Sequence, residues 1–152
     1  MNLQLHASPL ERDTFSPFGD VIEIDGADRF SINDGWAERF HDLAQLSIDS
    51  DGGRACLSIF RAKPRPIPIA ATIMERHRLG SQAFVPLSRS PFLILVALPG
   101  NAPSGPTQLS LFVSDGRQGV NYHPGVWHHP LLTFHQLTDF VVIDRVGKRP
   151  DC

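Results

Sequence analysis

The sequence predicts a mainly β fold, a barrel or sandwich of short strands with a few short helices. Thirteen prolines and twelve glycines interrupt the 152 residues so often that short strands are favoured over long helices. Apolar runs follow one another with turn residues roughly every 8–12 positions, which is typical of β-sandwiches and barrels. Because the chain has the length of one domain and no internal repeat, we expect a single domain over residues 1–152.

One short helix is predicted near the amino terminus. Ser8 can cap it, Pro9 suits its first position, Glu11 stands at the capping-box position, and Ser16-Pro17 ends it. The other elements, in chain order, are a strand at residues 20–25, a polar, turn-rich segment at 25–42, a hairpin-like turn at 49–53, a strand at 55–63, an extended proline-spaced segment at 64–68, and strands at 72–77, 82–87, 92–98, 108–113 and 140–145.

Composition excludes several classes of function. The formal net charge of −2 gives no electrostatic footprint for nucleic acid. The longest apolar run, residues 92–98, is far shorter than the ~20 residues that span a bilayer, so no membrane partner is expected. The residues after Met1 lack the basic and apolar regions of a signal peptide, and the two cysteines make no disulfide framework. These features predict a cytoplasmic protein.

The first candidate site is the segment from Glu75 to Gln82. Alternate side chains of a strand share a face, so Glu75 and His77 would point the same way, whereas on a helix they would diverge. Gln82 begins the next strand after the turn at Leu79-Gly80 and can return to that face. A carboxylate, an imidazole and an amide would then converge inside the barrel. The alternative is an outward, solvated Glu/His pair, since alternation does not identify the inner face.

The second candidate site is the histidine-rich stretch 119–131. Four of the seven histidines lie between positions 123 and 135, and the turn at Pro124-Gly125 brings His123 and His128 near each other. Tyr122 stands beside them. The alternative is that each histidine is a partly buried structural residue whose ring is satisfied.

Three further polar residues are candidates for binding a substrate. Arg61 shares strand parity with Leu57 and Ile59, so it can end an inward row and bind a carboxylate; the alternative is a surface arginine at the end of a strand. Arg39 lies in the polar stretch, where a salt bridge to a nearby acid is the alternative. Asn33 can line the mouth of a barrel or simply form an Asx-type turn.

Two of these stretches resemble the two cupin motifs. Residues 119–128 contain a glycine followed by Pro-Gly-x-x-His at a strand turn, which resembles the second motif, and the stretch 75–82 resembles a modified first motif. The resemblance implies a cupin-like β-barrel of the jelly-roll type and a divalent-metal site whose ligands here would be His77, His128, Glu75 and Gln82. Because Glu75 replaces the first histidine of the usual pattern, only two imidazoles remain, and we expect any ion to bind weakly.

The match is narrower than the cupins as a whole. Five stretches spread over nearly the whole chain resemble the ureidoglycolate lyase (ureidoglycolate hydrolase) family, namely residues 18–22, 38–44, 75–84, 119–131 and 139–145. The last stretch is followed by Val146 where the family commonly shows glycine. This resemblance implies a homodimer that cleaves (S)-ureidoglycolate to glyoxylate and urea in allantoin (purine) degradation, with nickel dependence in some members.

Splitting ureidoglycolate needs a base for its hydroxyl proton, an acid for the departing urea nitrogen, and a cation or donors for its carboxylate. Glu75, His77 and His128 suit the proton transfers near neutral pH, with acid and base not yet distinguished. The remaining candidates would contact the substrate: Gln82 and Asn121 at the ureido amide, Arg61 or Arg39 at the carboxylate, and Tyr122, His123 and Asn33 around them.

Other functions stay open. A hydrolase acting on the same substrate would release ammonia and carbon dioxide, and the residues hardly distinguish it from a lyase. A non-catalytic cupin that binds a small carboxylate would not need the acid and base groups at Glu75, His77 and His128. A redox metal cupin is disfavoured by the missing first-motif histidine.

Overall fold

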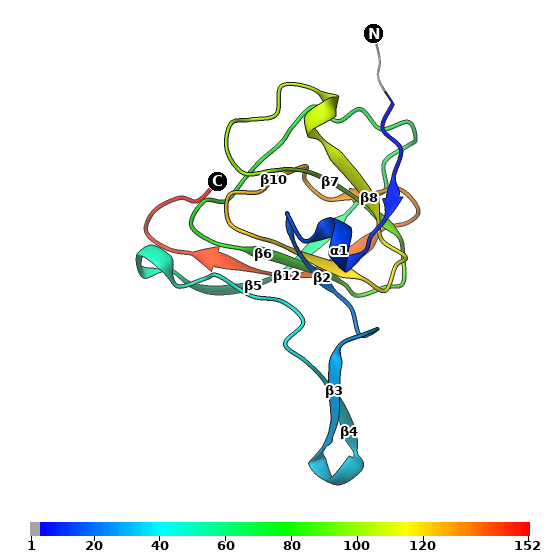
Figure 1. The fold of residues 1–152 in the computed structure, drawn as a ribbon, viewed down its shortest axis with the longest axis vertical. Coiled ribbons are helices and arrows are strands. Elements are labelled where there is room, and N and C mark those ends of the chain that lie inside the picture. Colours follow the sequence, from blue (N-terminus) through cyan, green and yellow to red (C-terminus); the bar gives the residue numbers. More distant parts are fainter. Residues whose placement is uncertain (1–3) are drawn as a thin grey trace.

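Two five-stranded sheets form the body of the molecule in the computed structural model, which describes residues 4–152 (Figure 1). The first sheet has the order β1-β8-β7-β10, with β11 also on β7; its strands are β1 (Ser8–Pro9), β7 (Phe92–Ala97), β8 (Ser110–Val113), β10 (Trp127–His128) and β11 (Leu132–Thr133). The second has the order β2-β9-β6-β12-β5; its strands are β2 (Gly19–Ile22), β5 (Arg54–Ala62), β6 (Gln82–Pro86), β9 (Gly119–Tyr122) and β12 (Thr138–Val146).

The two sheets meet in an aromatic core. Phe92 of β7 and Phe140 of β12 lie edge to face with ring centroids 5.0 Å apart, so a side chain of one sheet contacts a side chain of the other. Buried and partly exposed residues alternate along the first half of β12, because one face of the strand meets the core and the other faces outward. The predicted mainly β, cupin-like fold with a few short helices is confirmed.

The helical segments are shorter than predicted. The helix α1 covers only Arg12–Phe15, and the predicted start at Ser8 is wrong because Ser8 and Pro9 form β1, which pairs in parallel with β8. The described residues also contain three 3-10 turns: η1 (Asn33–Gly35), η2 (Ser50–Gly52) and η3 (Pro106–Gln108). Within residues 4–152, none of the helices is long or apolar enough to cross a membrane.

The prediction of a strand at residues 72–77 is wrong except at one position. Glu75 forms an isolated antiparallel bridge with His128, and the rest of residues 63–81 lies outside the named strands. Three prolines in this segment remove backbone donors that a strand next to β5 would need. The segment therefore crosses from β5 to β6 as an irregular connection.

A separate hairpin projects from the body at residues 28–41, where the sequence predicts only a polar, turn-rich segment. Its strands β3 (Asp28–Ile32) and β4 (Ala37–His41) pair with each other and, among the described residues, with no other strand. Figure 1 shows the hairpin extending away from both sheets. The prediction missed these strands because most of their side chains are exposed, so neither face carries a clear apolar row.

Candidate active site

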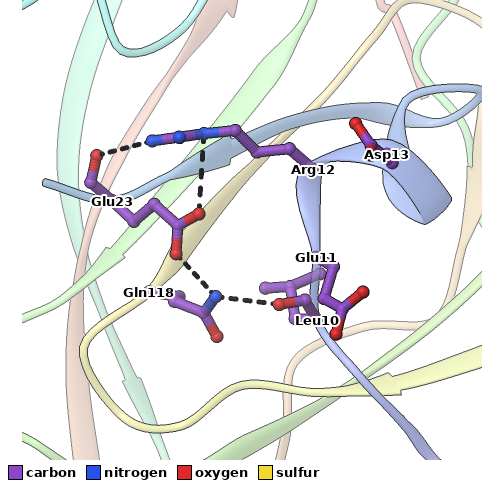
Figure 2. Close-up of a pocket in the computed structure, with 6 residues that line it drawn as sticks. All are labelled: Leu10, Glu11, Arg12, Asp13, Glu23 and Gln118. Carbon is purple, nitrogen blue, oxygen red and sulfur yellow. Dashed lines mark hydrogen bonds and ion pairs between the residues drawn. The ribbon is translucent and has the colours of Figure 1, made fainter. Parts of the chain in front are cut away.

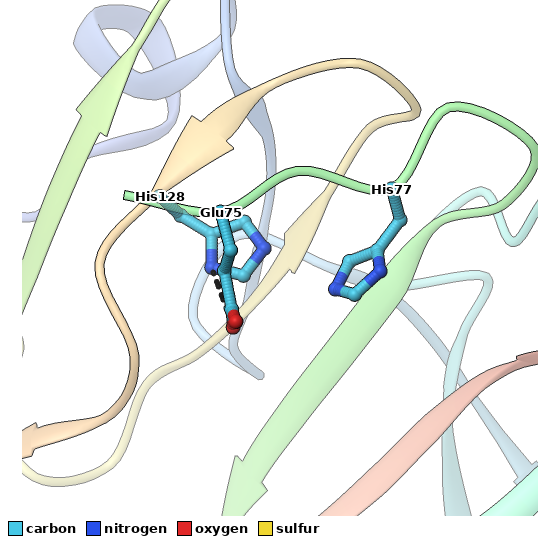
Figure 3. Close-up of side chains that lie close together, drawn as sticks. All are labelled: Glu75, His77 and His128. Atoms are coloured by element: carbon cyan, nitrogen blue, oxygen red, sulfur yellow. Dashed lines mark ion pairs between the residues drawn. The ribbon is translucent and has the colours of Figure 1, made fainter. Parts of the chain in front are cut away.

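Glu75, His77 and His128 converge at one place, as Figure 3 shows, and are called the acid–base cluster below. One ligand atom from each side chain lies within 4.8 Å of the others. Backbone hydrogen bonds hold them there: the N–H groups of Glu75 and His128 each donate to the other's carbonyl at 2.8 Å, and the N–H of Gly125 donates to the carbonyl of His77 at 2.7 Å. The Gly125 turn has a positive φ of 85°, which glycine adopts without strain.

His128 is the most buried member of the acid–base cluster, with 1% of its surface exposed. Its ring stacks on Tyr122 with centroids 4.2 Å apart and an angle of 4° between the planes. Burial, followed by the neighbouring His77, lowers the pKa of His128 to about 3, so its ring is neutral near neutral pH. Burial and the Glu75 carboxylate likewise raise the pKa of Tyr122 above its ordinary value, so its phenol stays protonated.

A chain of hydrogen bonds orients His77. The amide nitrogen of Gln82 donates to Asp144 at 3.1 Å, which directs the amide oxygen toward Nε2 of His77, also at 3.1 Å. On the other side of the ring, Nδ1 of His77 lies 3.2 Å from the backbone carbonyl of Asp151. Both ring nitrogens therefore face oxygen atoms, which fixes the orientation of the ring.

The carboxy-terminal segment contacts the acid–base cluster, which the sequence reasoning missed. The carboxylate of Asp151 accepts a hydrogen bond from the backbone N–H of Leu79 at 2.6 Å, beside His77. The thiol of Cys152 lies 3.9 Å from Glu75, and burial followed by that carboxylate raises the thiol pKa. Nothing in the local pattern of these residues signals such contacts. Asp144, in contrast, could have been found, because it lies directly opposite Gln82 in the register of β12 and β6.

The structure does not bring Asn121 and His123 into the acid–base cluster. Both contact Asp20: the amide nitrogen of Asn121 donates to its carboxylate at 3.0 Å, and Nε2 of His123 lies 3.1 Å away. Burial alone would raise the pKa of Asp20, but hydrogen bonds from Asn121, the backbone of Gln45 and His123 hold that pKa below its usual value. Successive residues of a strand point to opposite faces, so Asn121 faces away from Tyr122.

Arg61 also lies apart from the acid–base cluster, and of its two predicted placements the structure has the surface one and not the inward row. Its guanidinium binds the carboxylate of Asp139 at 2.8 and 3.1 Å on the surface. Leu57 and Ile59, which share its parity on β5, are 72% and 57% exposed, so this row faces outward. Apolar residues occur on both faces of β5, and the inward Phe60 packs on Phe84.

Asn33 and Arg39 lie on the projecting hairpin, away from the acid–base cluster of the same chain (Figure 1). The guanidinium carbon of Arg39 lies 5.9 Å from the ring centre of Phe30, the residue opposite it in the ribbon. Arg39 forms no ion pair with any acid of the described residues; the salt bridge of the hairpin joins Arg29 to Glu38.

A second group of polar side chains lines an open pocket outside the acid–base cluster (Figure 2). There Glu23 pairs with Arg12 at 3.5 Å and accepts a hydrogen bond from Gln118 at 2.7 Å, while Gln118 also donates to the carbonyl of Leu10 at 2.9 Å. These groups satisfy one another and join the amino-terminal segment to the loop before β9. Because Glu23 and Gln118 are engaged with neighbouring groups, we assign them a structural role.

The acid–base cluster has the donors of a metal site. Its two imidazoles and one carboxylate, with the Gln82 amide oxygen beside His77, make a mixed nitrogen and oxygen set that suits first-row transition ions. Nε2 of His128 is buried without a hydrogen-bond partner in the described structure, which is unusual for an imidazole that has only a structural role. These residues therefore fit a divalent ion.

Comparison with known proteins agrees with this geometry. The family model described as ureidoglycolate lyase matches residues 2–152. Proteins named ureidoglycolate lyase from Pseudomonas syringae pv. tomato (52% identity over 148 residues), Burkholderia cepacia (51% over 149) and Azotobacter vinelandii (51% over 148) each align with 97% of this chain, and with 86%, 83% and 89% of their own lengths. The chain therefore belongs to the ureidoglycolate lyase family.

Proposed function

We propose that this chain cleaves (S)-ureidoglycolate to glyoxylate and urea by acid–base catalysis of carbon–nitrogen bond cleavage. The observation that carries the proposal is the convergence of Glu75, His77 and His128 from two distant stretches of the chain. The family and the names of its members support the choice of substrate. A binding module for a small carboxylate would need no such combination of carboxylate and imidazoles.

The reaction needs two proton transfers. The base removes the proton of the substrate hydroxyl, the oxygen forms the carbonyl of glyoxylate, and the bond from that carbon to the ureido nitrogen breaks with its electron pair leaving on nitrogen. The acid then protonates this nitrogen, which departs as urea. No water is consumed, in contrast to the hydrolase alternative, which would release ammonia and carbon dioxide.

We assign the base to Glu75 and the acid to His77. The Glu75 side chain is about one third exposed, and among the described residues its carboxylate lies only near the neutral ring of His128 at 3.8 Å and the thiol of Cys152 at 3.9 Å, so it can accept a proton. The ring of His77 is held in one orientation by oxygen atoms beside both of its nitrogens, and an imidazole is a common general acid near neutral pH. His128 stays neutral and fixed on Tyr122, so we assign it to orienting the substrate.

Gln82 and Tyr122 are the substrate-binding candidates that lie beside the acid–base cluster. Gln82 is tied to Asp144 and His77, so we assign it to positioning His77 and to presenting its amide to the ureido group. Asn121 and His123 contact Asp20 instead, and we assign them to holding the scaffold.

A divalent ion would be held by His77, His128, Glu75 and Gln82, and the family resemblance implies nickel. When bound, such an ion would polarise the hydroxyl and carboxylate oxygens of the substrate. We propose that it is loosely held, because only two ligands are imidazoles. Exhaustive chelation followed by add-back of single ions tests this. Turnover that survives chelation leaves the acid–base cluster to work alone; turnover that is lost and restored by nickel makes its members ligands.

The products test the proposed function. Purified protein is incubated with racemic ureidoglycolate, and urea, ammonia and glyoxylate are measured against time, together with the enantiomer that remains. We expect equal amounts of urea and glyoxylate and loss of the (S) form only. Ammonia as the nitrogen product would assign the hydrolase reaction, and no turnover would leave a binding protein. The cytoplasmic location stays a prediction from the two free cysteines, Cys56 and Cys152.

A further inference from the structure

We propose that the β3–β4 hairpin is an exchanged arm. In a dimer of this chain it lies across the mouth of the acid–base cluster of the second copy, where its Arg39 binds the carboxylate of the substrate. This inference rests on the proposed function for the identity of that carboxylate. It assigns the predicted homodimer a catalytic purpose, because each site is complete only when the other copy is present.

The hairpin needs a surface that its own chain does not supply. A two-stranded ribbon alone is marginally stable in water at best, and β3 and β4 pair only with each other among the described strands. Trp36 at its tip is 91% exposed and Phe30 is 45% exposed. Large aromatic side chains presented in this way are the usual anchors of protein interfaces.

The tip of the hairpin holds its shape at a conformational cost. Asn33 and Asp34 have positive φ angles of 54° and 55°, and Gly35 has 88°. Side chains other than glycine rarely adopt this region, and such backbone strain gathers at binding sites and functional turns. The turn presents Trp36 outward, where nearly all of its surface is exposed.

The base of the hairpin is firmly attached to the body. The segment that returns from β4 is bound by Asp20, which accepts a hydrogen bond from the N–H of Gln45 at 3.0 Å, and by Asn121, which donates to the carbonyl of Gln45 at 2.9 Å. Further along, Ser47 and Ser81 exchange hydrogen bonds of 2.8 and 2.9 Å. An arm fixed in this way at its base can position a residue at its far end.

The substrate carboxylate needs a cation, and no ion pair of residues 4–152 brings an arginine or lysine to the acid–base cluster. No lysine or arginine of residues 4–152 forms an ion pair with Glu75. Arg76, its neighbour in sequence, donates to the carbonyl of Gly100 and stacks on Trp127 at 4.4 Å. Arg61 is paired with Asp139 on the outer surface. Arg39 forms no ion pair with an acid of residues 4–152, and its planar guanidinium matches a carboxylate.

The irregular segment before Glu75 carries exposed apolar side chains on which the arm can pack. The irregular segment that leads to Glu75 exposes Ile67 at 68% and Ile73 at 60%. Phe30 and Arg39 lie opposite each other in the ribbon and so share a face. When Trp36 and Phe30 pack on this apolar rim, Arg39 on the same face is brought to the mouth of the cluster.

The second copy is the occupant that these features favour. Each chain carries both the arm and the exposed Ile67 and Ile73 on which an arm would pack. In a two-fold symmetric dimer each arm therefore contacts the other copy, and the two contacts are identical. Charge complementarity agrees as well, since Arg39, which forms no ion pair within residues 4–152, would meet a cluster that contains Glu75 and no described arginine or lysine partner. An unrelated partner protein would leave the cluster without its cation.

Subunit complementation tests the exchange. Chains carrying Arg39→Ala and Glu75→Gln are co-expressed with different tags, and the mixed dimer is purified through both. In an exchanged dimer the intact cluster of the first chain receives Arg39 from the second, so one of the two sites is complete. We expect about half the wild-type kcat/KM per dimer, with each parent dimer at least ~10-fold below wild type.

Three results would overturn the proposal. If Arg39 acts within its own chain, both sites of the mixed dimer lack a residue, and its activity stays at the level of the parents. If Arg39→Ala keeps the wild-type kcat/KM, the residue does not bind substrate. If no mixed dimer is recovered, no arm is exchanged. The wild-type dimer assayed for urea and glyoxylate in parallel separates these failures from a failure of the proposed function.

A second measurement does not depend on activity. Sedimentation of Trp36→Ala is compared with that of Leu87→Ala, which changes an exposed apolar side chain (61%) outside the hairpin. We expect the first variant to raise the dimer dissociation constant by at least ~10-fold and the second to leave it unchanged. Equal dissociation constants for the two variants would remove the hairpin tip from the interface.

Discussion

The two faces of β9 carry similar chemical groups and use them differently. On the inner face Tyr122 stacks on His128, and Gln82 opposite it on β6 reaches His77. On the outer face Asn121, with the nearby His123, is bound to Asp20. Each face thus combines a histidine, a carboxylate and an amide. Residue type alone therefore does not identify the catalytic set.

The difference lies in how the carboxylates are occupied. Asp20 accepts hydrogen bonds from three donors, and they lower its pKa, so it is an anchor that holds other groups in place. Glu75 has only two weak partners among the described residues, His128 at 3.8 Å and the Cys152 thiol at 3.9 Å, and the buried Nε2 of His128 has none. A group that has few partners can still exchange protons with a substrate.

The largest expected effect is at Glu75. Glu75→Gln keeps the size and hydrogen-bonding capacity of the side chain but removes the group that accepts the hydroxyl proton. We expect kcat to fall by about 10²–10⁴-fold, with a smaller change in KM, measured by steady-state release of urea. A kcat within a few-fold of wild type would move the role of base to a histidine.

A smaller loss is expected at Asp144. Its carboxylate fixes the Gln82 amide, and in Asp144→Asn the new amide would allow Gln82 to turn its nitrogen toward His77. We expect kcat to fall by about 10-fold, a size typical of residues that orient catalytic ligands. The matched control is Asp139→Asn on the outer face of the same strand, which breaks only the exposed pair with Arg61. Equal kcat values for the two variants would separate Asp144 from catalysis.

Asp20 is expected to matter for stability more than for turnover. Asp20→Asn replaces the acceptor of three hydrogen bonds, so the free energy of unfolding should fall by roughly 1–3 kcal/mol, while kcat at saturating substrate changes less than about threefold. Chemical denaturation at neutral pH measures the first quantity. A variant with wild-type stability and a collapsed kcat would place the chemistry on the outer face.

The dependence of the free energy of unfolding on pH below neutrality tests the structural role of Asp20 as well. The pKa of Asp20 is lower in the folded chain than its ordinary value of 3.8, so its contribution is fully present above that value and is lost as pH falls through the lowered folded pKa. The stability difference between wild type and Asp20→Asn should therefore be constant from neutral pH to about pH 5 and shrink below pH 4. A stability difference between wild type and Asp20→Asn that grows as the pH falls would contradict a lowered pKa of Asp20 in the folded chain.

The smallest effect is expected at Arg61. Its side chain is 68% exposed and pairs with Asp139 on the surface, where an ion pair contributes little. Arg61→Ala should leave kcat and KM for ureidoglycolate within about twofold of wild type. A large rise in KM would restore the carboxylate-binding role that the sequence allows for it.

Much of the strand order along the chain could be predicted, because turn residues mark the ends of β6, β7 and β12 and apolar residues fill them. The convergence of Glu75 and His77 was also predictable, although a single bridge and backbone hydrogen bonds produce it where a strand was expected. The side of β5 on which Arg61 lies was not predictable. The strand exposes the apolar residues Leu57 and Ile59 and packs Phe60 toward the core, so apolar residues occupy both of its faces and the sequence does not show which face is buried.

The hairpin and the carboxy-terminal contacts could not be predicted for a different reason. A ribbon that packs on nothing in its own chain leaves no apolar period in its sequence. The contacts of Asp151 with Leu79 and His77 join residues more than seventy positions apart through a loop without periodicity. Such contacts depend on tertiary structure, which local patterns do not report.

The most direct test of the account compares two amides on opposite faces of one sheet. Gln82→Ala and Asn121→Ala are measured together for kcat at saturating ureidoglycolate and for the free energy of unfolding. We expect Gln82→Ala to lower kcat by about 10-fold or more, and Asn121→Ala mainly to lower stability, by roughly 1–3 kcal/mol. A loss of kcat in Asn121→Ala at wild-type stability, with Gln82→Ala fully active, would contradict the assignment of catalysis to the inner face.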